Sequence, residues 1–208
     1  PRKVNVGQDP YLSPDGKRLM VKRDQNLWMI DLEKGTALRI TSTFSQMPVW
    51  SPDGKRIVYA ARDVKMKAAN GSPEEEVLLK RIGFPSSWSP DGRFIIFEEG
   101  GVKTRMDIWA LPMFGERKEY PLSQSSFDER SPQLSPDGRW LAFSANPSGK
   151  WQLYVRRVST EGGVQPVAAG IAQDHGVYWS PGSSELLFVR GVDLVALRYD
   201  GAGDRFVV

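Results

Sequence analysis

Ser51-Pro52-Asp53-Gly54 and its repetitions decide the fold of this chain of 208 residues. The phrase occurs four times intact and once altered, as Ser13-Pro14-Asp15-Gly16, Ser51-Pro52-Asp53-Gly54, Ser89-Pro90-Asp91-Gly92, Ser135-Pro136-Asp137-Gly138 and Ser180-Pro181-Gly182-Ser183. Successive copies begin 38, 38, 46 and 45 residues apart. Repetition at about 40–45 residues per unit is the signature of a β-propeller with one four-stranded blade per repeat.

The phrase has the chemistry of a tight turn. Proline presets φ for the second position of a type I turn, Asp bonds its neighbouring backbone, and Gly takes the left-handed conformation that closes a hairpin. Strand-like residues flank each copy, such as Val49-Trp50 before the second copy and Ile57-Val58-Tyr59 after it. We therefore assign structural roles to Asp15, Gly16, Asp53, Gly54, Asp91, Gly92, Asp137 and Gly138. The fifth copy drops the Asp without losing its strands, which argues against a catalytic role for the others.

The rest of each repeat supplies three further strands. Third strands are predicted at Leu27–Leu32, Val64–Lys67, Asp107–Leu111, Gln152–Arg156 and Asp193–Leu197, and fourth strands at Ala37–Thr41, Val77–Arg81, Glu119–Leu122, Gln165–Ala168 and Arg205–Val208. No helical period is visible. We expect an all-β fold, a β-propeller of four-stranded antiparallel blades forming one domain over 1–208, with blades at about 7–43, 44–82, 83–124, 128–170 and 173–208. Propellers of this repeat type more often have six or more blades, so the native ring could be larger than five.

Two second strands are apolar without alternation, Phe94-Ile95-Ile96-Phe97 and Leu186-Leu187-Phe188-Val189. A half-exposed antiparallel strand would alternate apolar and polar residues. We therefore expect both faces of these strands to be buried against neighbouring blades.

Composition excludes several classes of function. The chain is 40% apolar and 25% charged, with a net charge of +3 that is spread rather than clustered, so we expect no nucleic-acid partner. Without cysteine there is no disulfide, thiol nucleophile or thiolate metal site. No run approaches 18 apolar residues, so the chain is not expected to span a membrane. It begins at Pro1, which suggests a processed or excised piece, and Glu74-Glu75-Glu76 is interpreted as a solvated turn.

No catalytic motif is present in the sequence. His175 is the single histidine, which rules out His-Glu-x-x-His, and neither Gly-x-Ser-x-Gly nor a phosphate-binding loop occurs. Gly201-Ala202-Gly203 lacks the last glycine of a dinucleotide fingerprint. We therefore predict no catalytic residues, no metal and no cofactor.

Candidate binding residues come from their place in the repeat. Residues four to six positions before each turn lie where one blade crosses to the next, around one mouth of a propeller channel. The side chains there differ between repeats while the turns are uniform, as expected if the rim carries recognition. The predicted rim residues are Gln8, Asp9, Gln46, Met47, Glu129, Arg130, Asp174 and His175, with Phe84 and Pro85 at the third crossing. The alternative is that they are ordinary solvated loop residues.

The stretch from Trp50 to Tyr59, followed in each repeat by a strand of the Leu27–Leu32 type, resembles the propeller repeats of TolB. The resemblance covers nearly the whole chain. It implies a periplasmic propeller of the kind that binds the peptidoglycan-associated lipoprotein and colicins. The same repeats occur in the gating propellers of prolyl-oligopeptidase-like peptidases.

A second resemblance rests on Glu74–Lys80, Phe84-Pro85, Trp88-Ser89, Asp107–Pro112, Ser135–Phe143 and Tyr154-Val155-Arg156. These segments are similar to the C-terminal extracytoplasmic propellers of acidobacterial receptor-like serine/threonine kinases and winged-helix regulators. The resemblance implies a sensor joined through a membrane helix to an output domain. Neither the His-Arg-Asp nor the Asp-Phe-Gly motif of a kinase occurs in this chain.

The sequence thus predicts a non-enzymatic bacterial propeller that binds another protein, with a small ligand as the alternative, in the periplasm or elsewhere outside the cytoplasmic membrane. It could be a sensor or a scaffold for partners. Two other functions stay open. One is the substrate-gating propeller of a serine peptidase, and the other is a structural subunit of an envelope complex.

Overall fold

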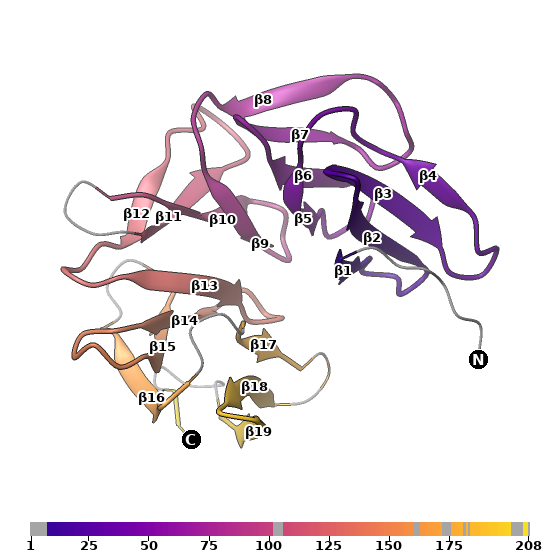
Figure 1. Ribbon diagram of the computed structural model, residues 1–208. Coiled ribbons are helices and arrows are strands. Elements are labelled where there is room, and N and C mark those ends of the chain that lie inside the picture. The colour runs from indigo at the N-terminus through magenta and orange to yellow at the C-terminus, as the bar shows by residue number, and fades with distance from the viewer. Residues whose placement is uncertain are drawn as a thin grey trace. The chain divides into compact units, whose positions relative to one another are not determined.

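The computed structural model describes residues 8–101, 106–159, 163–171, 176–180, 182, 184–200, 206 and 207. All regular elements in these ranges are strands, and they form five sheets (Figure 1). No helix that could cross a membrane occurs in this part of the chain. The chain divides into two compact units, one ending at Trp88 and one beginning at Ser89. The interpretation of the chain as a single domain stays a prediction.

Each sheet is built from strands that follow one another along the chain. The first sheet holds β1 (Gln8–Leu12), β2 (Arg18–Arg23), β3 (Asn26–Asp31) and β4 (Ala37–Arg39). The second holds β5 (Gln46–Trp50), β6 (Arg56–Ala60), β7 (Val64–Ala68) and β8 (Glu75–Leu79). The third holds β9 (Phe84–Trp88), β10 (Phe94–Glu99), β11 (Asp107–Pro112) and β12 (Tyr120–Ser123). The fourth holds β13 (Glu129–Leu134), β14 (Trp140–Ala145), β15 (Gln152–Arg157) and β16 (Gln165–Ala169). The fifth holds β17 (Tyr178–Trp179), β18 (Glu185–Arg190) and β19 (Asp193–Arg198).

The predicted all-β propeller class with five blades is confirmed. Each sheet pairs its strands in sequence order as an antiparallel meander, the unit of a propeller blade. The predicted second and third strands agree with the structure to within a residue or two at their ends. Half of the predicted last strand at 205–208 lies outside the described residues, but Val207 forms an isolated antiparallel bridge with Asp200.

The Ser-Pro-Asp-Gly turns have the predicted geometry. In the second copy the Gly54 N–H donates to the Ser51 carbonyl oxygen at 2.8 Å, and Gly54 has φ of +66°. The Ser51 hydroxyl donates to Asp53 Oδ1 at 2.6 Å and accepts the Arg56 N–H at 2.9 Å. The same contacts recur in the other three intact copies, so each Asp bonds within its own turn.

Buried aromatic side chains join consecutive blades within each unit. In the first unit, Met20, Leu27, Trp50, Ile57 and Tyr59 belong to one core that draws on the first two sheets. The Trp50 indole N–H donates to the Tyr11 carbonyl oxygen at 3.0 Å. In the second unit, the Trp179 indole donates to the Gln133 carbonyl oxygen at 2.9 Å. Both tryptophans directly precede the Ser of a turn, and both acceptors lie two residues before it in the preceding repeat.

The prediction that two second strands are buried on both faces is confirmed for one and wrong for the other. Ile95, Ile96 and Phe97 are at most 1% exposed. In β18, by contrast, Leu186 and Phe188 are buried, whereas the residues between and after them are half-buried. The neighbouring strand β19 is also exposed on one face, since Leu194 in this strand is 68% exposed. Within the described residues of the second unit, one face of the fifth sheet therefore has less apolar cover than β10 has.

The interpretation of Glu74-Glu75-Glu76 as a turn is wrong for Glu75 and Glu76, which begin β8. The Glu75 carboxylate accepts a hydrogen bond from the Tyr59 hydroxyl at 2.8 Å and pairs with Lys65 Nζ at 2.8 Å. Burial raises the pKa of Glu75, but the hydrogen bonds from Lys65 and Tyr59 outweigh it, so the pKa is lowered. Lys67 Nζ lies 3.7 Å from the same carboxylate, and its side chain is only 4% exposed. Glu75 therefore neutralises a buried lysine.

Candidate functional site

The first strands of three blades share a bulge at the predicted rim. Pairing with the second strand shifts register between Gln8 and Tyr11, between Gln46 and Val49, and between Arg130 and Gln133. At each shift one non-glycine residue has a left-handed φ, with values of +54° for Asp9, +50° for Met47 and +54° for Ser131. The next residue in each case is a proline, which has no N–H for the ladder and favours bulges.

The bulges display side chains in the first unit. Asp9 is exposed, and Met47 is 42% exposed, which is high for a large apolar side chain. Gln46 is half-buried beside Met47, and Gln8 begins β1. The third crossing differs, because Pro85 occupies the position of Met47 and cannot adopt a left-handed φ. Asp174 and His175 lie outside the described residues.

Glu129 does not face the solvent as a rim residue was expected to do. It is 2% exposed, and its carboxyl group accepts a hydrogen bond from Ser123 of the third sheet. The neighbouring Arg130 is half-buried. Arg130 Nε is buried without a hydrogen-bond partner among the described residues. Glu129 and Arg130 therefore belong to the interior of the fourth blade as much as to its edge.

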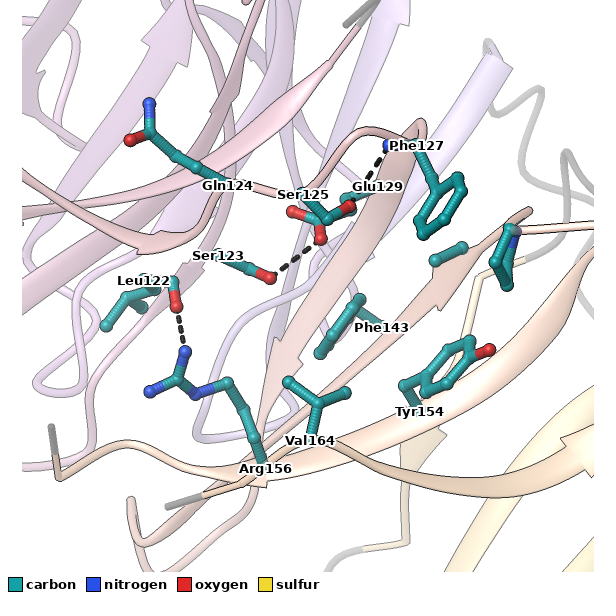
Figure 2. A pocket seen from close by; sticks show the side chains of 12 residues that line it. Leu122, Ser123, Gln124, Ser125, Phe127, Glu129, Phe143, Tyr154, Arg156 and Val164 are labelled. Carbon is teal, nitrogen blue, oxygen red and sulfur yellow. Dashed lines mark hydrogen bonds between the residues drawn. The ribbon is translucent and has the colours of Figure 1, made fainter. Parts of the chain in front are cut away.

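A pocket of about 400 Å³ opens beside Glu129 in the second unit. Its walls are mainly apolar (Figure 2). They come from β12 and the loop after it, from the start of β13, from β14, from β15 and from the segment before β16. Four apolar side chains, Phe127, Phe143, Tyr154 and Val164, form much of the lining. The polar groups are those of Ser123, Gln124, Ser125, Glu129 and Arg156. This volume and this combination of apolar wall with few polar groups are typical of small-ligand sites.

The carboxyl group of Glu129 is half satisfied. Oε1 accepts a hydrogen bond from the Ser123 hydroxyl at 2.7 Å. Oε2 is buried and has no partner with hydrogen-bond geometry among the described residues. Burial raises the pKa of Glu129; the hydroxyls of Ser123 and nearby Ser125 lower it by less. The Ser125 oxygen accepts the Phe127 N–H at 3.2 Å, which leaves the Ser125 O–H as a donor beside the Glu129 carboxyl group. A buried acceptor of this kind costs free energy until a donor reaches it.

Arg156 lies close enough to Glu129 for each to influence the pKa of the other, but its hydrogen bonds go elsewhere. Nη1 donates to the Leu122 carbonyl oxygen (Figure 2), and Nε donates to the Arg157 carbonyl oxygen at 3.1 Å. Burial lowers the pKa of Arg156, and the charge of Glu129 raises it in part. Asp107, which is 5% exposed, adds a second negative charge that raises the pKa of Glu129 further.

The site residues show what the repeat pattern could and could not reveal. The bulges had a signal, a proline three residues before the Ser of the turn at positions 10, 48 and 132. The pocket had none, because its wall is assembled from four separate segments and only Glu129 stood among the predicted residues. No group of three or more His, Asp or Glu residues suited to a metal ion occurs in the part of the chain that the structure describes.

Solved structures of similar fold support the propeller assignment. The chain superposes on TolB from Acinetobacter baumannii with a TM-score of 0.79, at 20% identity, covering 95% of this chain and 52% of that one. It superposes on oligogalacturonate lyase from Vibrio parahaemolyticus with a TM-score of 0.67, at 15% identity, covering 91% of this chain and 61% of that one. The TolB-like propeller fold is therefore shown. Since the fold also occurs in a lyase, the fold by itself assigns no activity.

In sequence, the chain is 30% identical over 152 residues to the uncharacterized peptidase YuxL of Bacillus subtilis (strain 168). The match covers 66% of this chain but only 22% of the peptidase. The chain thus spans about half of the TolB structure and less than a quarter of YuxL. No family model matches the sequence.

Proposed function

We propose that the chain is a non-enzymatic β-propeller module that binds another protein through exposed first-strand bulges, with Asp9 and Met47 as the contacts of its first unit. The observation that carries the proposal is the recurrence of one strained backbone conformation at equivalent places in three blades, with a different side chain at each. A left-handed non-glycine residue costs about 1–3 kcal/mol and tends to persist where function needs it. The constancy of the backbone and the variety of Asp9, Met47 and Ser131 suit a scaffold that presents individual contacts.

The proposed compartment and type of partner are supported by the similarity to TolB. Similarity to TolB supports a protein-interaction module that works outside the cytoplasmic membrane of a bacterium. A sensor role within an acidobacterial receptor-like kinase or regulator is a finer version of the same proposal. Reading the gene that encodes this chain tests that version, because it requires a kinase or winged-helix domain and one membrane helix upstream.

Met47 offers a matched test of the rim. Met47 in β5 and Val77 in β8 are each 42% exposed and lie on opposite edge strands of the second sheet. Immobilised wild-type protein is used to capture partners from the envelope fraction of the source bacterium, followed by mass spectrometry. We expect one stoichiometric protein that Met47→Lys loses and Val77→Lys keeps. Equal capture by both variants would show that the rim does not bind this partner. Thermal unfolding of both variants verifies that each is folded.

The second candidate is the gating propeller of a serine peptidase, which is favoured by the similarity to YuxL. An antibody against this chain, used on cells labelled with a fluorophosphonate probe, tests it. A labelled species larger than 23.3 kDa would assign the propeller to a serine hydrolase. An unlabelled species would remove this candidate. A purely structural subunit is distinguished by stable co-purification with an envelope complex that both lysine variants retain.

A further inference from the structure

Three apolar cores of the molecule are built from the same four positions of the repeat. One blade supplies the residue seven places after the Ser of its turn and the third-strand residue that pairs with the ninth place, which together we call its forward surface. The next blade supplies the residue before the Ser of its turn and the residue six places after that Ser, which we call its rear surface. In chain order, these residues are Met20, Leu27, Trp50 and Ile57 in the first core, Ile96, Ile108, Leu134 and Leu141 in the second, and Ala142, Leu153, Trp179 and Leu186 in the third. Consecutive blades therefore pack through one recurring interface.

The forward surface of the fifth blade is exposed. Leu194, which pairs with Val189, is 68% exposed, whereas the equivalent residues of the other blades are at most 1% exposed: Leu27, Val64, Ile108 and Leu153. At the position of Leu187, which is half-buried, the other blades have residues that are 0% exposed: Met20, Val58, Ile96 and Ala142. Tyr178 and Ala196 pair with Leu187 from either side and are exposed, so they extend the apolar surface across the sheet. Contiguous exposed apolar side chains of this kind mark an interaction surface.

The rear surface of the first blade is exposed as well. Its two residues, Leu12 and Leu19, pair with each other across β1 and β2. Leu12 is 57% exposed, whereas the residues at its position in the other blades are at most 8% exposed: Trp50, Trp88, Leu134 and Trp179. Leu19 is half-buried, whereas its equivalents are 0% exposed: Ile57, Ile95, Leu141 and Leu186. Val21, two residues further along β2, is buried, so the exposed part of this surface lies next to the turn that begins at Ser13.

We propose that the chain self-associates, with the forward surface of the fifth blade of one copy packing against the rear surface of the first blade of a second copy. Leu187 and Leu194 of one copy then contact Leu12 and Leu19 of the other, as the equivalent residues do in the three cores. The occupant is a second copy because one chain displays both halves of the interface that its other blades form. Two different surfaces meet, so the contact is heterologous, and a pair of copies keeps one surface of each kind for further copies. The inference goes beyond the proposed function, since Asp9 and Met47 belong to neither surface.

Sedimentation velocity at protein concentrations from about 1 µM to about 1 mM tests the proposal. We expect the average mass of the wild type to rise with concentration above the 23.3 kDa of one chain. Leu194→Lys and Leu12→Lys should each stay monomeric, because association would bury an unpaired charge. The matched control is Val192→Lys, which should associate like the wild type, since Val192 lies in the same hairpin as Leu194, is 100% exposed and belongs to neither surface. A wild type that is monomeric at every concentration would overturn the proposal, and so would an equal loss of association in Val192→Lys. Thermal unfolding verifies that each variant is folded.

A mixture of the two monomeric variants distinguishes this contact from other ways of pairing. Leu194→Lys retains the rear surface and Leu12→Lys retains the forward surface, so equal amounts should form pairs of twice the monomer mass. These pairs should not grow further, because each of their two remaining surfaces carries a lysine. Self-association of Leu12→Lys alone would show that two fifth blades pair with each other and would contradict the proposal. A mixture that stays monomeric, or a monomeric wild type that captures a different protein through Leu194, would also exclude a second copy as the occupant.

Discussion

Arg18 of the first blade lies over the indole of Trp50 in the second, with Cζ 5.0 Å from the centre of the ring. Its Nη2 also donates to the Gly54 carbonyl oxygen at 2.8 Å. The guanidinium therefore touches both the strand before the second turn and the turn itself. A second contact of the same kind occurs between Arg56 and Trp88, at 5.6 Å. In both pairs the arginine lies five residues after the Ser of one turn, and the tryptophan directly precedes the Ser of the next turn.

Replacing Arg18 tests this link between blades. Arg18→Met should lower the free energy of unfolding by about 1–3 kcal/mol, because it removes a charge-assisted hydrogen bond and a cation–π contact. Arg198→Met is the control, since that side chain is 89% exposed and the effect should stay within about 0.5 kcal/mol. Urea unfolding followed by tryptophan fluorescence measures both. Equal midpoints for the two variants would mean that the contact over Trp50 adds no stability.

Gly138 and Gly92 form a matched pair that separates backbone strain from crowding. Both have left-handed φ, +71° and +74°, so alanine is strained at either position by about 1–2 kcal/mol. A Cβ at Gly92 would meet no atom within 4 Å, whereas one at Gly138 would lie 3.3 Å from Pro90 Cδ in the preceding turn. We expect Gly138→Ala to lower the melting temperature more than Gly92→Ala does. The reverse order would show that Pro90 yields without cost.

The turn aspartates should make the protein sensitive to acid. Hydrogen bonds from Ser51 and from the Lys55 N–H lower the pKa of Asp53 below 3.8. In Asp137 burial opposes the shift, but the hydrogen bonds of Ser135 and Arg139 prevail and the pKa is again lowered. A lowered folded-state pKa contributes stability that is complete above the unfolded value and is lost as the pH falls through the folded value. Unfolding free energy should therefore drop between about pH 5 and about pH 2.

The double variant Asp53→Asn, Asp137→Asn gives the control for acid sensitivity. It should be less stable than the wild type at neutral pH and lose less on acidification, because two of the titrating carboxyl groups are gone. Denaturant midpoints at the two pH values provide the comparison. An identical loss in variant and wild type would assign the acid sensitivity to other groups.

Glu129 should change the free energy of unfolding with pH in the opposite direction to the turn aspartates. Burial and the charge of Asp107 raise its pKa, although Ser123, Ser125 and Arg156 oppose them. A carboxyl group with a raised folded-state pKa contributes its stability below the unfolded value of 4.5, and that contribution is lost as the pH rises through the folded value. The variant Glu129→Gln does not titrate, so its stability relative to wild type should increase as the pH rises above 4.5. A difference that is constant with pH would show that Glu129 titrates normally.

The sequence predicts most of the scaffold because the scaffold repeats. A turn such as Ser51-Pro52-Asp53-Gly54 is fixed by contacts within five residues, from Ser51 to Arg56, so local chemistry is enough to recognise it. The strands next to it then follow from hydrophobic runs. The burial of Leu187 and Val189 was overestimated for a different reason. An apolar sequence shows that a strand is suited to burial on both faces. Whether both faces are buried depends on what packs against the sheet.

The candidate site lies beyond the reach of such local rules. Glu129 is buried because Ser123, six residues earlier, and Asp107, on another strand, surround it together with the wall of the fourth blade. Nothing in the residues next to Glu129 distinguishes it from Asp9, which occupies a nearby place in the first repeat and is exposed. Whether a predicted rim residue is exposed therefore depends on tertiary contacts. The repeat pattern in the sequence identifies only the position of the residue in the blade.

The indole hydrogen bonds from Trp50 to Tyr11 and from Trp179 to Gln133 connect fixed positions of neighbouring repeats. Donor and acceptor are therefore inherited together whenever one whole repeat is copied. A gene duplication that inserts a further unit of 38 residues brings its own tryptophan for the blade before it and its own carbonyl for the blade after it. The number of blades can thus change by recombination without new contacts having to evolve, as long as the breakpoints fall at the same place in the repeat.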